Sequence, residues 1–184
     1  MKRTIILLMV LVLGFSLLAG CGGKGGGGGD PSKVTGETYD AGNVSALVPK
    51  GWKAYPSIDP FKVGSGEDDK DPNGVSIHKG AKSDFDIMST PGVKITYFPD
   101  TVDIGIDMAK GFYDDVKDLD KPLTVGDKTW KGFYAKTGDY PILVLYIDDQ
   151  PQKYQLLLWL ENSGKKISIE DAEVLAIIGS IKGK

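Results

Sequence analysis

Two apolar runs in the last third of the chain constrain its fold most. They read PILVLYIDD from position 141 and KYQLLLWLEN from position 153, and a short turn-forming segment separates them. Each run has the length of one β-strand and is almost continuously apolar, which is typical of strands buried on both faces of a sheet. We therefore predict two neighbouring central strands in a sheet that other elements cover on both faces.

Further strands are predicted from shorter patterns. Apolar and polar residues alternate in VSIHKG at 75–80 and in GVKITYFPD at 92–100, and a short apolar piece spans 44–48. Prolines within 52–63 permit an edge strand or irregular structure there but not a central strand. The dipeptide Gly-Asp at 126–127 lies between two short β runs and predicts a hairpin. The sheet is therefore expected to be mostly antiparallel.

Two amphipathic helices are predicted to cover this sheet. Apolar residues recur every four positions between 104 and 119, and Asp103 precedes them as a suitable N-cap. Ser168 to Asp171 resembles a capping box and starts the second helix. The expected fold is α+β, in one domain over residues 33–184. The buried stripes comprise Ile104, Met108, Ala109, Phe112, Val116 and Leu119 in the first helix and Val174, Ile177, Ile178 and Ile181 in the second.

Four stretches of these elements carry a resemblance to a known family. They are VPKGW at 48–52, ITYFPDT at 95–101, TVGDKTWKGFYA at 124–135 and EDAEVLAIIGSIK at 170–182. The chain over residues 39–182 resembles the PsbP-like domain of small bacterial lipoproteins and of the extrinsic photosystem subunit that names the family. The resemblance implies an α/β/α sandwich and a non-enzymatic accessory or binding role. It carries over no functional residue.

The N-terminal segment predicts an export signal. Lys2 and Arg3 precede an apolar stretch over 5–18, and small residues follow it, which is the order of a secretory signal peptide. The sequence LAGC at 18–21 resembles a bacterial lipobox, which implies a lipoprotein signal peptide over residues 1–20 and lipidation of Cys21. The alternative is ordinary secretory cleavage that leaves Cys21 as a free thiol.

A glycine-rich segment then separates Cys21 from the domain. Residues 22–32 are mostly glycine, and together with Cys21 they predict a flexible tether with an end-to-end distance on the order of 18 Å. The chain is thus expected to be anchored by its lipid to the extracytoplasmic face of a cell membrane. Its net charge of −3 argues against a nucleic-acid partner.

An acidic segment before the first alternating strand is the candidate metal site. Asp69, Asp71 and Asn73 occupy positions 1, 3 and 5 of a calcium loop, and the carbonyl of Val75 would supply position 7. Position 12 falls on Gly80, so the bidentate glutamate of that motif is absent. The alternatives are a weak calcium site and a solvated acidic turn without a metal.

Aromatic residues are the other candidates for binding. Trp52 and Trp130 are each flanked by lysine or glycine, which suggests half-buried rings on a binding surface, although strand aromatics also form cores. The sole histidine, His78, is expected on an exposed strand face. Paired acids such as 114–115 and 148–149 resemble solvated surface more than a catalytic pair.

The leading hypothesis is therefore a lipid-anchored extracytoplasmic protein that binds an envelope protein partner or a small ligand without catalysis. The second hypothesis is a structural module stabilised by calcium at residues 69–74. The third is a hydrolase that uses an unconventional acid pair. No cofactor is expected apart from this calcium.

Overall fold

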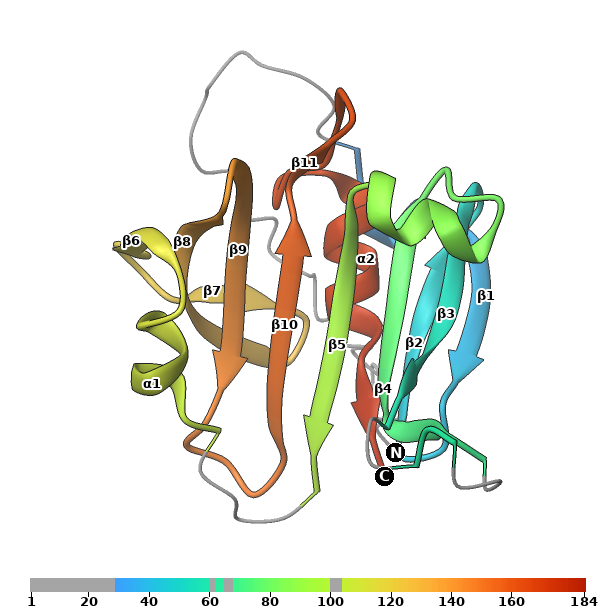
Figure 1. Cartoon of the computed structure of the whole chain (residues 1–184), viewed down its shortest axis with the longest axis horizontal. Helices are drawn as coiled ribbons and strands as arrows, with labels where there is room; N and C mark the ends of the chain where they lie inside the picture. The colour runs from blue at the N-terminus through green and yellow to red at the C-terminus, as the bar shows by residue number, and fades with distance from the viewer. Residues whose placement is uncertain (1–28, 60–61, 65–67, 100–103) are drawn as a thin grey trace, which may run out of the picture.

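The computed structural model describes residues 29–59, 62–64, 68–99 and 104–184, and Figure 1 shows their arrangement. Eight strands form an antiparallel main sheet in the order β3-β4-β5-β10-β9-β8-β6, with β7 paired to β8. The strands are β3 (Trp52–Ile58), β4 (Lys70–Lys79), β5 (Gly92–Phe98), β6 (Asp114–Asp118), β7 (Leu123–Val125), β8 (Lys128–Thr137), β9 (Tyr140–Ile147) and β10 (Lys153–Trp159).

A smaller antiparallel sheet and a few helices complete the fold. The small sheet has the order β1-β2-β13, and a two-stranded hairpin, β11-β12, follows β10. In Figure 1, α2 lies behind the main sheet, and α1 lies beside β8 and β9. The bounds are β1 (Gly36–Asp40), β2 (Val44–Pro49), β11 (Glu161–Asn162), β12 (Lys165–Lys166), β13 (Lys182–Gly183), α1 (Ile106–Lys110), α2 (Ala172–Ser180) and the 3-10 helices η1 (Pro31–Lys33) and η2 (Asp84–Ser89).

The larger hydrophobic core lies between one face of the main sheet, α2 and the small sheet. The apolar stripe of α2 is completely buried, as the sequence predicts. Alternate residues of the central strands meet it, and Trp130, Tyr154 and Leu156 are among the largest. This layer of apolar contacts is the main source of the stability of the fold.

A second, smaller core lies on the opposite face of the main sheet. It joins Ile106 of α1 to Phe133, Ile142 and Val144 of β8 and β9. β9 is therefore buried on both faces, as its continuous apolar run predicts, whereas β10 is buried on one face and only partly buried on the other. The strands over 44–48, 75–80 and 92–100 and the hairpin at 126–127 are also confirmed.

The structure corrects the helix predicted over residues 104–119. Here α1 ends at Lys110, Asp115 has a positive φ of 52°, and Asp114–Asp118 forms the edge strand β6 instead. A spacing of four is even, so it fits the two-residue period of a strand as well as a helix. Gly111 also disfavours helix continuation at this point. The fold is α+β with a mostly antiparallel sheet, and its longest described helix has nine residues.

The structure also describes a few residues that precede the predicted domain. Asp30 caps η1 by accepting a hydrogen bond from the backbone N–H of Ser32 at 2.9 Å, so the last residues of the predicted tether are ordered. Cys21 and the predicted signal peptide lie outside the described residues, and these assignments stay predictions. No described helix is long and apolar enough to span a membrane.

Candidate functional site

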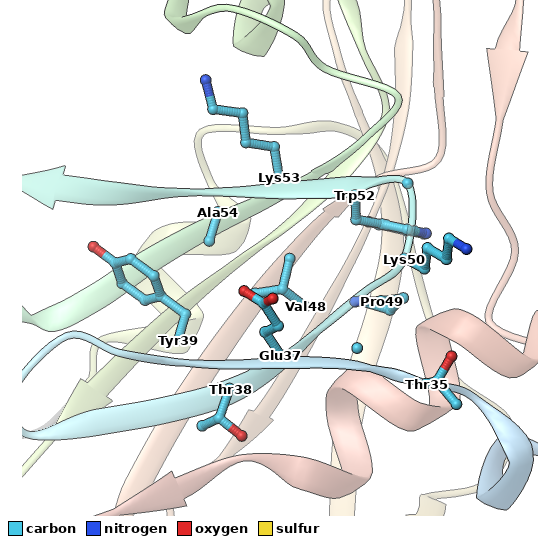
Figure 2. Close-up of a pocket in the computed structure, with 12 residues that line it drawn as sticks. Thr35, Glu37, Thr38, Tyr39, Val48, Pro49, Lys50, Trp52, Lys53 and Ala54 are labelled. Atoms are coloured by element: carbon cyan, nitrogen blue, oxygen red, sulfur yellow. The ribbon is translucent and has the colours of Figure 1, made fainter.

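A cleft lies where the small sheet meets the edge of the main sheet. Its volume is about 610 Å³, and its walls are the segments 35–39 and 48–54. These segments belong to β1, to the end of β2, and to the first half of β3. Figure 2 shows β1 and β3 on opposite sides of the cleft, with side chains from both strands pointing into it.

The floor of the cleft is apolar and aromatic. In Figure 2, Tyr39 projects from β1, Val48 from β2, and Trp52 and Ala54 from β3. Trp52 is only 8% exposed and belongs to the larger hydrophobic core, so it supports the floor from below. The prediction that Trp52 takes part in a binding surface stays untested, but the expectation that its ring is half exposed is wrong.

Two strand edges border this floor. β3 is the terminal strand of the main sheet and β1 is the terminal strand of the small sheet, so each has one edge without a strand partner among the described residues. Such an edge presents backbone N–H and C=O groups that can pair with another chain. At the far end of β3, Pro56 adjoins a register shift, which limits regular pairing there.

Glycine allows the close approach of β1 and β2 beside the cleft. Gly36 pairs with Pro49, and a Cβ at Gly36 would overlap the carbonyl of Val48. Gly51 has a φ of +87° in the turn that leads into β3, a conformation that glycine adopts without strain. The cleft therefore depends on one position with no room for a side chain, Gly36, and on one, Gly51, whose backbone conformation would strain other residues.

Charged groups lie at the rim of the cleft and behind it. Glu37 points inward from β1, and neither Glu37 nor Lys50 forms a salt bridge with any described residue. Behind the floor, Lys79 Nζ lies 5.6 Å from the centre of the Trp52 ring and 2.7 Å from Glu173 Oε2. Burial, the largest single influence, acts to raise the pKa of Glu173, but hydrogen bonding and the positive charge of Lys79 together outweigh it and hold the pKa below its usual value. This pair fixes Trp52 between β4 and α2.

Trp130 does not lie on a binding surface. Its side chain is completely buried in the larger core, 6.0 Å from the ring of Tyr154 between ring centres. The adjacent lysine, Lys131, lies on the opposite face of β8, because successive residues of a strand point to opposite faces. The prediction of a surface at Trp130 is therefore wrong.

His78 is buried and not exposed as predicted. It is 1% exposed, its ring stacks 6.0 Å from Trp159, and its Nδ1 lies 3.3 Å from the Thr90 carbonyl oxygen. Burial lowers the pKa of His78, and the hydrogen bond to Thr90 opposes this only in part. The segment that carries η2 covers this face of the sheet, since Tyr55 Oη donates to the Ser83 carbonyl at 2.7 Å.

The candidate calcium residues form a bulged strand end and not an isolated turn. Asp71 Oδ1 accepts from the Asn73 backbone N–H at 2.9 Å, and Asn73 Oδ1 accepts from Asn43 Nδ2 at 2.9 Å. Val75 is already in regular register with β3, whereas Asp69 precedes β4. Among the described residues, no three His, Cys, Asp or Glu side chains form a cluster suited to a metal ion. Calcium binding here stays a prediction.

The acid pairs considered for catalysis lie on the surface in salt bridges. Asp115 pairs with Lys136 at 2.6 Å. Asp148 and Asp149 both pair with Lys131, at 2.8 and 3.3 Å. Each of these three carboxylates thus pairs with a lysine at the protein surface, and Asp148 also lines a small pocket beside α1.

Of the residues that line the cleft, sequence reasoning singled out only Trp52 as a binding candidate. The segment VPKGW contributes Val48, Lys50 and Trp52, and all three line it. β1 was not predicted, because GETYD carries no buried apolar face and pairs only with β2. The one feature of GETYD that favours a strand is the pair Thr-Tyr, which lies in a short segment that ends in turn-forming residues.

Comparisons with known proteins identify no family. No family model matches the chain, and no curated protein matches it. A solved structure from Bacteroides thetaiotaomicron is similar over 81% of this chain, with a TM-score of 0.45 and 12% sequence identity. The similarity covers 48% of that protein, so this chain spans about half of its length.

Proposed function

We propose that this protein is a lipid-anchored extracytoplasmic binding protein that holds an extended segment of an envelope protein partner in the cleft between β1 and β3. The observation that carries the proposal is the combination of an apolar floor with two unpaired strand edges. The anchor is the lipid on Cys21, as the lipobox resemblance implies. The PsbP-like resemblance of residues 39–182 agrees with an accessory role.

The form of the cleft favours an extended peptide over a compact small molecule. The cleft is an open trough along two strands, and its apolar residues Tyr39, Val48 and Ala54 lie in its depth. A peptide that pairs with the β3 edge between Trp52 and Tyr55 would place alternate side chains on this floor. Backbone pairing would supply affinity, and the floor would select apolar side chains.

The charges at the rim add a second element of recognition. Glu37 and Lys50 carry opposite charges and have no salt-bridge partner among the described residues. A partner segment with a basic residue near Glu37 and an acidic residue near Lys50 would therefore dock in one direction. Such rim charges set specificity and association rate more than affinity.

A non-catalytic role is supported by the surroundings of the titratable side chains. His78 and Thr90 are enclosed, and the Thr90 hydroxyl donates to the Asp86 carbonyl at 2.6 Å. This pair has no solvent access through which a substrate could reach it. The surface acids are engaged by lysines, as described above.

Site-specific photo-cross-linking in cells tests the proposal. A photo-reactive amino acid replaces Glu37, which points into the cleft, or Thr38, which lies next to it on β1 but points away (Figure 2). We expect one reproducible partner to be captured from position 37 and not from position 38. Ala54→Arg should then abolish the capture, because Ala54 lines the trough and the long arginine side chain would fill it.

Two results would count against the cleft as the binding site of the partner. Equal capture from both positions would indicate a non-specific encounter, and capture that survives Ala54→Arg would place the partner elsewhere. Acylation of Cys21 is tested separately, by mass spectrometry of the N-terminal peptide from the membrane fraction. An unmodified Cys21 would refute the anchor.

A further inference from the structure

One end of the molecule carries two fully exposed apolar side chains that no described contact explains. Phe85 is 87% exposed and Met88 is 83% exposed, and both belong to η2. Single exposed apolar residues are common on protein surfaces, but two large ones on one short helix form a candidate interaction surface. We refer to η2 together with the β11-β12 hairpin, residues 161–166, as the η2 surface.

Direct contacts hold this surface together as one unit. Asn162 Nδ2 donates to the Met88 carbonyl at 3.0 Å and so ties the hairpin to η2. Asp86 Oδ2 accepts from the backbone N–H groups of Lys82 and Ser83 at 2.7 and 2.8 Å, which fixes the start of η2. The backbone that presents Phe85 and Met88 is therefore anchored at both ends.

The described chain begins at the same end of the molecule. Gly29 abuts the first residue of α2, since a Cβ on Gly29 would lie 3.2 Å from Ala172 Cβ. In Figure 1, the start of α2, η2 and the β11-β12 hairpin all lie at one end of the sheet, and α1 lies toward the other. Lys79 links these parts through its salt bridge to Glu173 in the first turn of α2.

The length of chain between Cys21 and Gly29 limits how far this end can lie from an anchor. Eight residues span at most about 29 Å when fully extended. A lipid on Cys21 would therefore keep the η2 surface within reach of the bilayer. Met108 is also 70% exposed, and it belongs to α1, which lies beside β8 and β9 away from the start of α2.

The charges of the η2 surface also suit a lipid headgroup layer. Asp84 lies 3.8 Å from Lys53 Nζ, and Glu161 lies 2.9 Å from Lys166 Nζ. Among the described residues, Lys82 forms no salt bridge, and it lies on the exposed connection into η2. Apolar side chains beside unneutralised lysine are typical of segments that enter the membrane interface.

We propose that the η2 surface docks on the bilayer, with Phe85 and Met88 entering the boundary between headgroups and acyl chains. This inference rests on the anchor in the proposed function and adds an orientation to it. The tethered domain would stand on this end, and the far end of the sheet would point away from the membrane.

Hydrogen exchange on anchored protein tests the docking. The chain from Cys21 onward, which contains every described residue, is coupled through its single thiol to maleimide-bearing lipid in vesicles of phosphatidylethanolamine and phosphatidylglycerol. The reference is the same chain with a capped thiol and no vesicles. We expect exchange at 83–89 to slow about tenfold, the factor that corresponds to burial of one large apolar side chain, with no change at 106–112.

Matched variants identify the side chains that are responsible. The double variant Phe85→Ser and Met88→Ser should lose the protection, and Met108→Ser should keep it, because all three residues are exposed and none supports the core. Absent protection at 83–89, equal protection at 106–112, or protection that survives the double variant would each overturn the proposal.

The chemical coupling separates this test from that of the proposed function. Because maleimide imposes the anchor, a negative result refutes docking of the η2 surface and leaves acylation of Cys21 and binding in the cleft unaffected. Conversely, an unmodified Cys21 in cells would refute the natural anchor, while the vesicle result would still decide whether this surface has affinity for a bilayer.

Discussion

His78 should make the stability of the protein depend on pH in a range where few other groups titrate. It is the only histidine in the chain, and burial between Tyr55, Trp159 and the η2 segment lowers its pKa. In the unfolded chain the same imidazole titrates near its usual pKa of about 6.5. The folded state therefore holds a neutral imidazole under conditions in which the unfolded state becomes charged.

The difference between the folded and unfolded pKa of His78 determines how the free energy of unfolding changes with pH. Between the folded and the unfolded pKa, the unfolded state binds more protons, so the free energy of unfolding rises with pH and falls as the solution is acidified. If His78 stays neutral in the folded state, acidification from about pH 7.5 to about pH 5.5 lowers the free energy of unfolding by about 1.4 kcal/mol. Carboxyl groups with lowered pKa values, such as Asp86 and Glu173, lose their stabilising contributions only at more acid pH, because their unfolded pKa values are near 4.

Urea denaturation at these two pH values measures the predicted loss. His78→Gln removes the titrating group, so its free energy of unfolding should change little between them. Tyr55→Phe is the matched control, because it removes the hydrogen bond to the Ser83 carbonyl at the same site. It should lower the free energy of unfolding by about 1 kcal/mol at both pH values and leave the pH dependence of stability intact. A wild-type protein equally stable at both values, or an NMR titration of His78 with a midpoint at or above its usual pKa, would refute the reasoning.

Three further outcomes are expected. Trp130→Ala should lower the free energy of unfolding by about 3 to 5 kcal/mol, measured by urea denaturation, since it empties a completely buried site; a small loss would contradict the assignment of Trp130 to the core. Gly92→Ala should cost about 1 to 3 kcal/mol in the same assay, because the new Cβ would lie 2.6 Å from His78 Nδ1 and 2.7 Å from a carbonyl oxygen, and a neutral result would show that the strands can separate. Calcium at about 10 mM should leave the melting temperature unchanged, because Asp71 and Asn73 already use side-chain oxygens in hydrogen bonds; a rise of a few degrees with calcium and not with magnesium would instead support the predicted site.

Sequence predicts those parts of the fold whose burial is evident from one short stretch of residues. β9 and β10 are apolar at nearly every position, so their central place in the sheet does not depend on knowing the partner strands. The stripe of α2 is similarly unambiguous, because its four isoleucine and valine positions fit a helix and no strand. These elements define the main sheet and its larger core.

The errors arise where a local pattern admits two geometries or where a distant segment decides burial. A spacing of four between apolar residues from Ile104 to Val116 fits a helix and also one face of a strand, and pairing of β6 with β8 decides between them. His78 alternates with Ile77 as predicted, but η2 covers its face and buries it. Trp130 has polar neighbours in sequence that lie on the other side of β8, so they carry no information about its own exposure.

The cleft lay beyond prediction for a related reason. Its walls come from two sheets, and neither the pairing of β1 with β2 nor the terminal position of β3 is encoded in a short stretch of sequence. The proline within β3, Pro56, indicates an edge strand, which is the one correct clue to its position. Which segment would lie opposite that edge could not be deduced.

The pairing of β13 with β2 has a consequence for the biogenesis of the protein. Lys184 Nζ contacts Asp40 at 2.7 Å across a separation of 144 residues, and the Lys184 backbone N–H donates to the Asn43 carbonyl. The small sheet thus cannot close until residues 182–184 are available to pair with β2, and contacts between such distant segments form late and slowly. If the predicted signal peptide directs export, this delay would help to keep the polypeptide unfolded, and so able to cross a membrane, until β13 pairs with β2.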